Sequence, residues 1–96
     1  MIKKYKGERF SDIKDLTIVD FYADWCGPCR MLSIVLEQLE DVDILKVNVD
    51  ENEDLAKEYG VMSIPNILIV KDGEVKKDLI GFMSKEDLED ELKEFR

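Results

Sequence analysis

Two cysteines three residues apart, Cys26 and Cys29, are the residues of this chain best suited to chemistry. They are its only cysteines, and they enclose Pro28, one of only two prolines, next to Trp25, the only tryptophan. At this spacing the two sulfurs can close a small disulfide ring if a helix begins between them. A reversible dithiol–disulfide pair is therefore the first chemistry to consider.

A strand and a helix must position these sulfurs. Residues 17–23 are β-branched and aromatic, which predicts a strand, and residues 28–40 carry apolar side chains at helical spacing. Cys26 then lies at the helix start, with Pro28 in the first turn, where a missing N–H costs nothing. Unpaired N–H groups and the helix dipole lower the pKa of the Cys26 thiol, which makes it the attacking sulfur. Cys29, one turn further in and less exposed, is expected to resolve the mixed disulfide.

The competing interpretation of the two cysteines is half of a zinc site. Zinc needs two more ligands, and the chain has no histidine and no further cysteine, so only dimerisation supplies them. We therefore expect no bound metal and no bound cofactor, because the sulfurs themselves carry the electrons. Without histidine, proton transfer falls to a carboxylate, a lysine or water.

Asp20 is the most informative polar residue outside the motif, because it interrupts a strand that is otherwise apolar on both faces. A buried carboxylate is costly unless it is neutral or paired, so its pKa should be raised. Asp20 is thus a candidate proton acceptor for Cys29 during resolution. The alternative is a strand-end aspartate bonded to backbone groups.

Composition restricts the class of protein. Ninety-six residues, 45% of them apolar, suit a single domain over residues 1–96. No apolar run is long enough to span a membrane, and the lysine-rich start lacks the apolar stretch of a signal peptide, so the expected location is the cytoplasm. A formal charge of −9 argues against nucleic acid as a partner.

The rest of the chain alternates strand and helix patterns. Strands are expected at residues 2–5, 44–50, 67–70 and 75–80. Helices are expected at residues 8–13, at residues 53–59 and after a capping box that Ser84 opens. Asp72-Gly73 predicts a hairpin turn between the last two strands. The order predicts an α/β fold with parallel strands first and an antiparallel hairpin at the end.

These features together resemble the thioredoxin family over nearly the whole chain, closest to a small single-domain member with a Trp-Cys-Gly-Pro-Cys active site. The residues that carry the resemblance are 19–31, 46–50, 60–65, 72–74 and Gly81. It implies the thioredoxin fold, a central mixed β-sheet flanked by helices on both faces. It also implies that the redox pair lies at the N-terminus of the second helix.

The resemblance assigns further site residues. It places Lys46 beside Asp20 as a counter-ion, and it implies a cis Ile64–Pro65 bond that faces the cysteines, with Ile64 pairing to the client's extended chain. It also implies an apolar rim that docks disulfide-bearing proteins. This rim comprises Trp25, Gly27, Pro28, Ile64, Ile80, Gly81 and Phe82.

The Gly-Pro pair between the cysteines implies a reductant of disulfides in client proteins, active as a monomer and regenerated by a separate thioredoxin reductase. That reductase is either a flavoprotein or ferredoxin-linked. Two alternatives stay open, a glutaredoxin-like or oxidising relative and a redox-silent binding module that uses the same surface. The sequence departs from the family pattern at Tyr22, at Ser63, at Asn66 and at residues 31–34, which lack the usual helix-kinking proline. These positions bear on partner choice and redox potential.

Overall fold

The computed structural model describes all residues from Met1 to Arg96 and contains one mixed β-sheet of five strands in the order β1-β3-β2-β4-β5. The strands are β1 (Ile2–Lys4), β2 (Thr17–Tyr22), β3 (Asp43–Asn48), β4 (Asn66–Lys71) and β5 (Glu74–Ile80). β3 runs parallel to both β1 and β2, whereas β4 is antiparallel to β2 and β5 is antiparallel to β4. The predicted parallel start and antiparallel end are confirmed.

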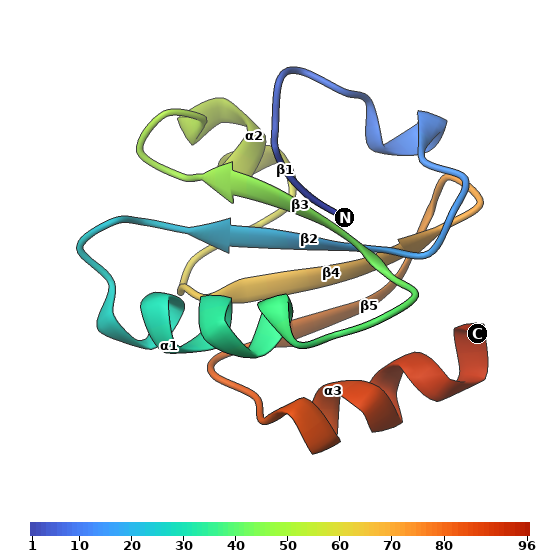
Figure 1. Cartoon of the computed structure of the whole chain (residues 1–96). Coiled ribbons are helices and arrows are strands. Elements are labelled where there is room, and N and C mark those ends of the chain that lie inside the picture. Colours follow the sequence, from blue (N-terminus) through green and yellow to red (C-terminus); the bar gives the residue numbers. More distant parts are fainter.

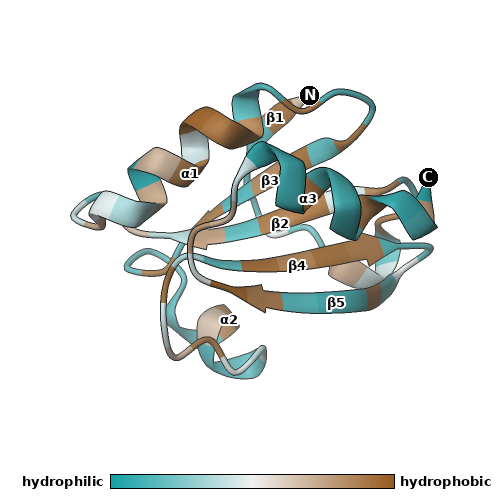
Figure 2. Ribbon diagram, turned by 90° about the horizontal axis from the view of Figure 1, so that it is seen from below, coloured by the Kyte–Doolittle hydropathy of each residue, from teal (hydrophilic) through white to brown (hydrophobic).

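Helices cover both faces of this sheet, as Figures 1 and 2 show. They are α1 (Gly27–Glu37), α2 (Glu53–Glu58) and α3 (Lys85–Leu92), with 3-10 turns η1 (Phe10–Asp12) and η2 (Lys93–Phe95). α1 and α3 lie on one face and α2 lies on the other. The helix expected at residues 8–13 is only the turn η1, so the redox pair opens the first α-helix rather than the second.

Alternation along the central strands divides the core into two parts. Ile18 and Ile44 point toward α1 and α3 and pack with Leu32 and Leu88 in one cluster. The intervening residues of the strands form a second cluster, whose aromatic members include Phe10. Residue 20 of β2 falls on the α1 side of the sheet, as do residues 46 and 48 of β3.

The Asp72-Gly73 turn joins β4 to β5 as predicted, and both residues have positive φ, 54° and 74°. The backbone N–H groups of Asp72 and Gly73 donate to the carbonyl oxygens of Lys14 and Ile13 at 2.9 and 2.6 Å. The hairpin tip is therefore bonded to the segment that leads into β2.

We predict that Gly73→Ala lowers the free energy of unfolding by about 2–4 kcal/mol, because positive φ and a steric clash act together. A Cβ at this position lies 2.5 Å from the carbonyl oxygen of Ser11. Gly60→Ala is the matched control, since Gly60 also has positive φ, 66°, but open space around its Cβ. Urea denaturation of both variants measures the difference; equal losses would contradict the steric argument.

Candidate active site

The two cysteines form a disulfide at the start of α1, with Cα atoms 5.2 Å apart. Cys26 is the N-cap of the helix, and its Sγ accepts a hydrogen bond from the backbone N–H of Cys29 at 3.2 Å. Gly27 and Pro28 form the start of the first turn, as predicted. Both cysteines are largely buried. When the pair is reduced, the N–H group directed at Cys26 favours its thiolate form.

Asp20 lies fully buried on β2, directly opposite Lys46 of β3 in the strand register. Its Oδ2 is 3.6 Å from the Lys46 Nζ, and neither carboxylate oxygen has a hydrogen-bond partner. The alternative of an aspartate bonded to backbone groups is therefore wrong. Burial raises the pKa of Asp20 to about 6, and the positive charge of Lys46 offsets part of that rise.

A loop before β4 brings Ile64 and Pro65 to the cysteines. The Ile64–Pro65 peptide bond is cis, as the resemblance implies. The carbonyl oxygen of Ile64 lies 3.9 Å from Cys26 Sγ, and the Ile64 side chain packs against Cys26 and Cys29. Because the disulfide carries no S–H, this is a contact rather than a hydrogen bond. The backbone N–H of Gly81 donates to Pro65 at 2.8 Å, which joins the end of β5 to the same region.

Exposed apolar side chains flank these contacts. Trp25 is 69% exposed beside Cys26, and its indole N–H donates to Asp50 Oδ2 at 2.9 Å. Ile80 and Phe82, on either side of Gly81, are also exposed. The expected rim residues thus lie on three segments, residues 25–28, 64–65 and 80–82. The last two segments are joined by the hydrogen bond between Gly81 and Pro65.

Three residues near the site were missed by the sequence analysis. Asp50 is the partner of the Trp25 indole, and Met62, three residues before Pro65, is almost fully exposed. Ser33 bonds to Lys46 through its hydroxyl. Only Ser33 had a usable signal, since it follows Cys29 by four residues and so shares its helix face.

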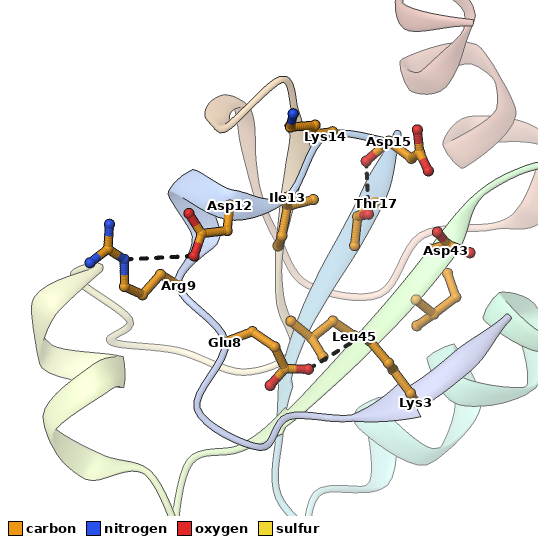
Figure 3. A pocket seen from close by; sticks show the side chains of 11 residues that line it. Lys3, Glu8, Arg9, Asp12, Ile13, Lys14, Asp15, Thr17, Asp43 and Leu45 are labelled. Carbon is orange, nitrogen blue, oxygen red and sulfur yellow. Dashed lines mark hydrogen bonds and ion pairs between the residues drawn. The ribbon is translucent and has the colours of Figure 1, made fainter.

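A separate pocket lies between β1, the η1 segment and the first residues of β2 and β3 (Figure 3). Four of its charged side chains pair with one another, Lys3 with Glu8 at 3.5 Å and Arg9 with Asp12 at 3.8 Å. None of the predicted site residues lines it. No three His, Cys, Asp or Glu side chains gather in a way that suits a metal ion, and no helix is long and apolar enough to cross a membrane.

A disulfide that caps a helix, in contact with the residue before a cis proline and on the sheet face that also carries a buried carboxylate, defines a thiol–disulfide exchange site. The sequence model of the family Thioredoxin matches residues 3–94. Thioredoxin of Bacillus subtilis is 48% identical over 80 residues, which cover 78% of this chain and 77% of the relative. Thioredoxin of Listeria monocytogenes is 45% identical over 85 residues, or 83% and 82% of the two chains.

Solved structures agree with this match. A thioredoxin variant from Halobacterium salinarum superposes with a TM-score of 0.88 at 35% identity, covering 98% of this chain and 89% of that one. The chain belongs to the thioredoxin family. Its Cys26–Cys29 pair makes it a dithiol–disulfide oxidoreductase, an enzyme of the protein-disulfide reductase type.

Proposed function

We propose that this chain acts as a single domain over residues 1–96 that reduces disulfides in client proteins. The observation that carries this proposal is the Cys26 sulfur at the N-cap of α1, where it accepts the N–H of Cys29. A helix N-terminus stabilises an anion, so Cys26 is the thiolate that attacks the client. One client sulfur leaves as a thiolate, and the other is joined to Cys26 in a mixed disulfide.

Cys29 resolves this intermediate. Its thiol gives a proton to the Asp20 carboxylate, and its sulfur then attacks Cys26 Sγ, breaks the bond to the client and forms the Cys26–Cys29 disulfide. The client leaves with two reduced sulfurs, and Asp20 returns the proton to solvent. The raised pKa of Asp20, about 6, makes the carboxylate a stronger base than an exposed aspartate. The nearby Lys46 ammonium partly stabilises the negative charge of the Asp20 carboxylate.

The rim selects extended client segments. Ile64 brings its backbone carbonyl oxygen to 3.9 Å from Cys26 Sγ, directly before the cis Pro65, which suits pairing with a client main chain. Trp25, Gly27, Pro28 and Gly81 complete the proposed docking surface, together with the exposed Ile80 and Phe82. Contact through shape and backbone rather than charge admits many clients.

A separate reductase must regenerate the dithiol, because the chain offers no second electron donor. We propose a thioredoxin reductase, either a flavoprotein or ferredoxin-linked, and disulfide-bearing proteins as clients. We place the protein in the cytoplasm as a monomer, with no bound cofactor, metal ion, nucleic acid or membrane among its partners. The net charge of −9 supports the exclusion of nucleic acid.

The reduction potential of the Cys26–Cys29 pair tests the direction of electron flow. We expect it to lie below that of the cytosolic glutathione pool, as a general reductant requires. Titration against a dithiol buffer, followed by the fluorescence of Trp25, measures it. A double Cys26→Ser/Cys29→Ser variant is the control, since its fluorescence should not respond to the buffer. A potential above the glutathione pool would indicate an oxidase or isomerase.

A redox-silent binding module makes the opposite prediction for the same double variant. If the surface alone is used, the variant keeps the biological function although it cannot exchange disulfides. We expect the function to be lost. If reduction of the Cys26–Cys29 disulfide required glutathione, the protein would instead be glutaredoxin-like.

A further inference from the structure

The Lys46 ammonium has three neighbours on the α1 side of the sheet. Its Nζ donates to the Ser33 hydroxyl at 2.8 Å, lies 3.6 Å from Asp20 Oδ2, and lies 4.5 Å from the centre of the Tyr22 ring. Only the first of these contacts is a hydrogen bond. The hydroxyl, rather than the carboxylate, therefore fixes the place of the cation.

The Asp20 carboxylate is left without any hydrogen bond, although it is buried. Buried polar atoms of this kind are rare, and a carboxylate usually takes a charge-assisted bond from a nearby ammonium. Here the Lys46 Nζ lies 3.6 Å from Asp20 Oδ2, which is longer than a hydrogen bond. Across β4 the register neighbour of Asp20 is the apolar Ile67, so no second donor approaches from that side.

The fold brings Ser33 and Cys29 to the same place. Ser33 follows Cys29 by one helical turn of α1, so both side chains project from one face of the helix. The β2–β3 register sets Lys46 directly beside Asp20, beneath that face. The charged group that faces Asp20 is Lys46 from β3. The titratable side chains nearest to this pair in the fold are Tyr22 of β2, whose ring lies 4.5 Å from the same ammonium, and Cys29, which lies one turn before Ser33 on α1.

We propose that Ser33 is a positioning residue for the resolution step: its hydroxyl holds the Lys46 ammonium away from hydrogen-bond distance of Asp20. The Asp20 carboxylate is then stabilised by the positive charge of Lys46, but both of its oxygens stay free to accept the Cys29 proton. This inference rests on the proposed role of Asp20 as proton acceptor. The hydroxyl of Ser33 makes its hydrogen bond to Lys46 and not to the sulfurs or the carboxylate, so Ser33 acts through the lysine.

Removal of the hydroxyl by Ser33→Ala should let the ammonium close on the carboxylate. A charge-assisted hydrogen bond favours the charged form and lowers the pKa of Asp20. A weaker base accepts the Cys29 proton less readily. We expect the resolution rate of Ser33→Ala to show its pH inflection about one unit lower than that of the unchanged chain. Ser33→Thr keeps a hydroxyl and should restore the original inflection.

Rapid mixing of the reduced full chain with a symmetrical nitrobenzoate disulfide measures this step. The first release of coloured thiolate reports attack by Cys26, and the second reports resolution by Cys29. The inflection of the second phase should move in Ser33→Ala while that of the first stays in place. Thermal unfolding of each variant checks that the fold is intact.

Asp20→Asn in the same experiment separates the two proposals. If Asp20→Asn removes the inflection and Ser33→Ala leaves it unchanged or moves it upward, the role of Ser33 is overturned and that of Asp20 stands. If Asp20→Asn leaves the inflection in place, the proton-acceptor role itself fails, and the inference about Ser33 fails with it.

Discussion

Replacement of Cys29 with serine is expected to trap client proteins on Cys26 as stable mixed disulfides. Cys26→Ser should trap nothing and should lower the rate of disulfide reduction on the order of 10³-fold or more, as loss of a nucleophile does. The asymmetry follows from the helix start. Cys26 is the N-cap whose sulfur receives an N–H, whereas Cys29 lies inside the first turn and supplies that N–H.

Non-reducing gel electrophoresis after incubation with a disulfide-bearing client, with and without a reductant, reads the trapped species directly. Mass spectrometry of the linked peptides identifies the sulfur that carries the client. The control is the unchanged chain, which keeps both sulfurs and should release the client. Clients linked through Cys29 in the Cys26→Ser variant would reverse the assigned order.

Local patterns in the sequence predicted the elements that hold the site. Cys26 and Pro28 mark the helix start because a cap and a first-turn proline act on their own backbone. Asp72-Gly73 predicted the hairpin turn in the same local way, since these two residue types readily adopt the positive φ that the turn requires. Ser84 caps α3 by accepting the N–H of Asp87, as its spacing indicates. Each prediction needs only a few neighbouring residues.

Contacts between distant segments were harder to predict. The Trp25–Asp50 hydrogen bond joins residues 25 positions apart, and the Ser33–Lys46 bond joins a helix to a strand. The spacing of Ser33 from Cys29 indicates a shared helix face, but no local pattern identifies the bonding partner in either pair, because a hydroxyl or a carboxylate on a surface usually bonds to water. Asp20 is the exception: its apolar strand alone predicted burial and a raised pKa, and the register places Lys46 opposite it, as the family resemblance implied.

Asp20→Asn is expected to stabilise the protein at neutral pH, in contrast to most buried substitutions. The pKa of Asp20 is about 6 in the fold, against an ordinary value of 3.8 for an exposed aspartate. Above pH 6 the folded chain must therefore carry a buried charge that the unfolded chain hydrates freely. Integration over this difference gives a cost of about 3 kcal/mol at pH 7, which the amide does not incur.

The pH dependence has a definite sign. Between the unfolded pKa of 3.8 and the folded pKa of about 6, the folded state binds the extra proton, so stability falls as pH rises. Well below pH 3.8 Asp20 is protonated in both states, and well above pH 6 it is ionised in both, so the slope disappears at either end. We therefore expect the unchanged chain and Asp20→Asn to have nearly equal stability at about pH 3, below both pKa values, and to diverge until the pH exceeds the folded pKa of about 6.

Urea denaturation of the oxidised protein across this range measures the divergence without interference from cysteine titration. Asp12→Asn is the control, because Asp12 is exposed in a surface ion pair and its loss should change stability by no more than about 0.5 kcal/mol at any pH. A constant offset for Asp20→Asn at all pH values would mean that packing, not charge, separates the variants. The same amide cannot accept the Cys29 proton, so the gain in stability should accompany slower resolution. Because the Asp20 carboxylate lowers the stability of the fold at neutral pH, its presence is best explained by its role as the acceptor of the Cys29 proton.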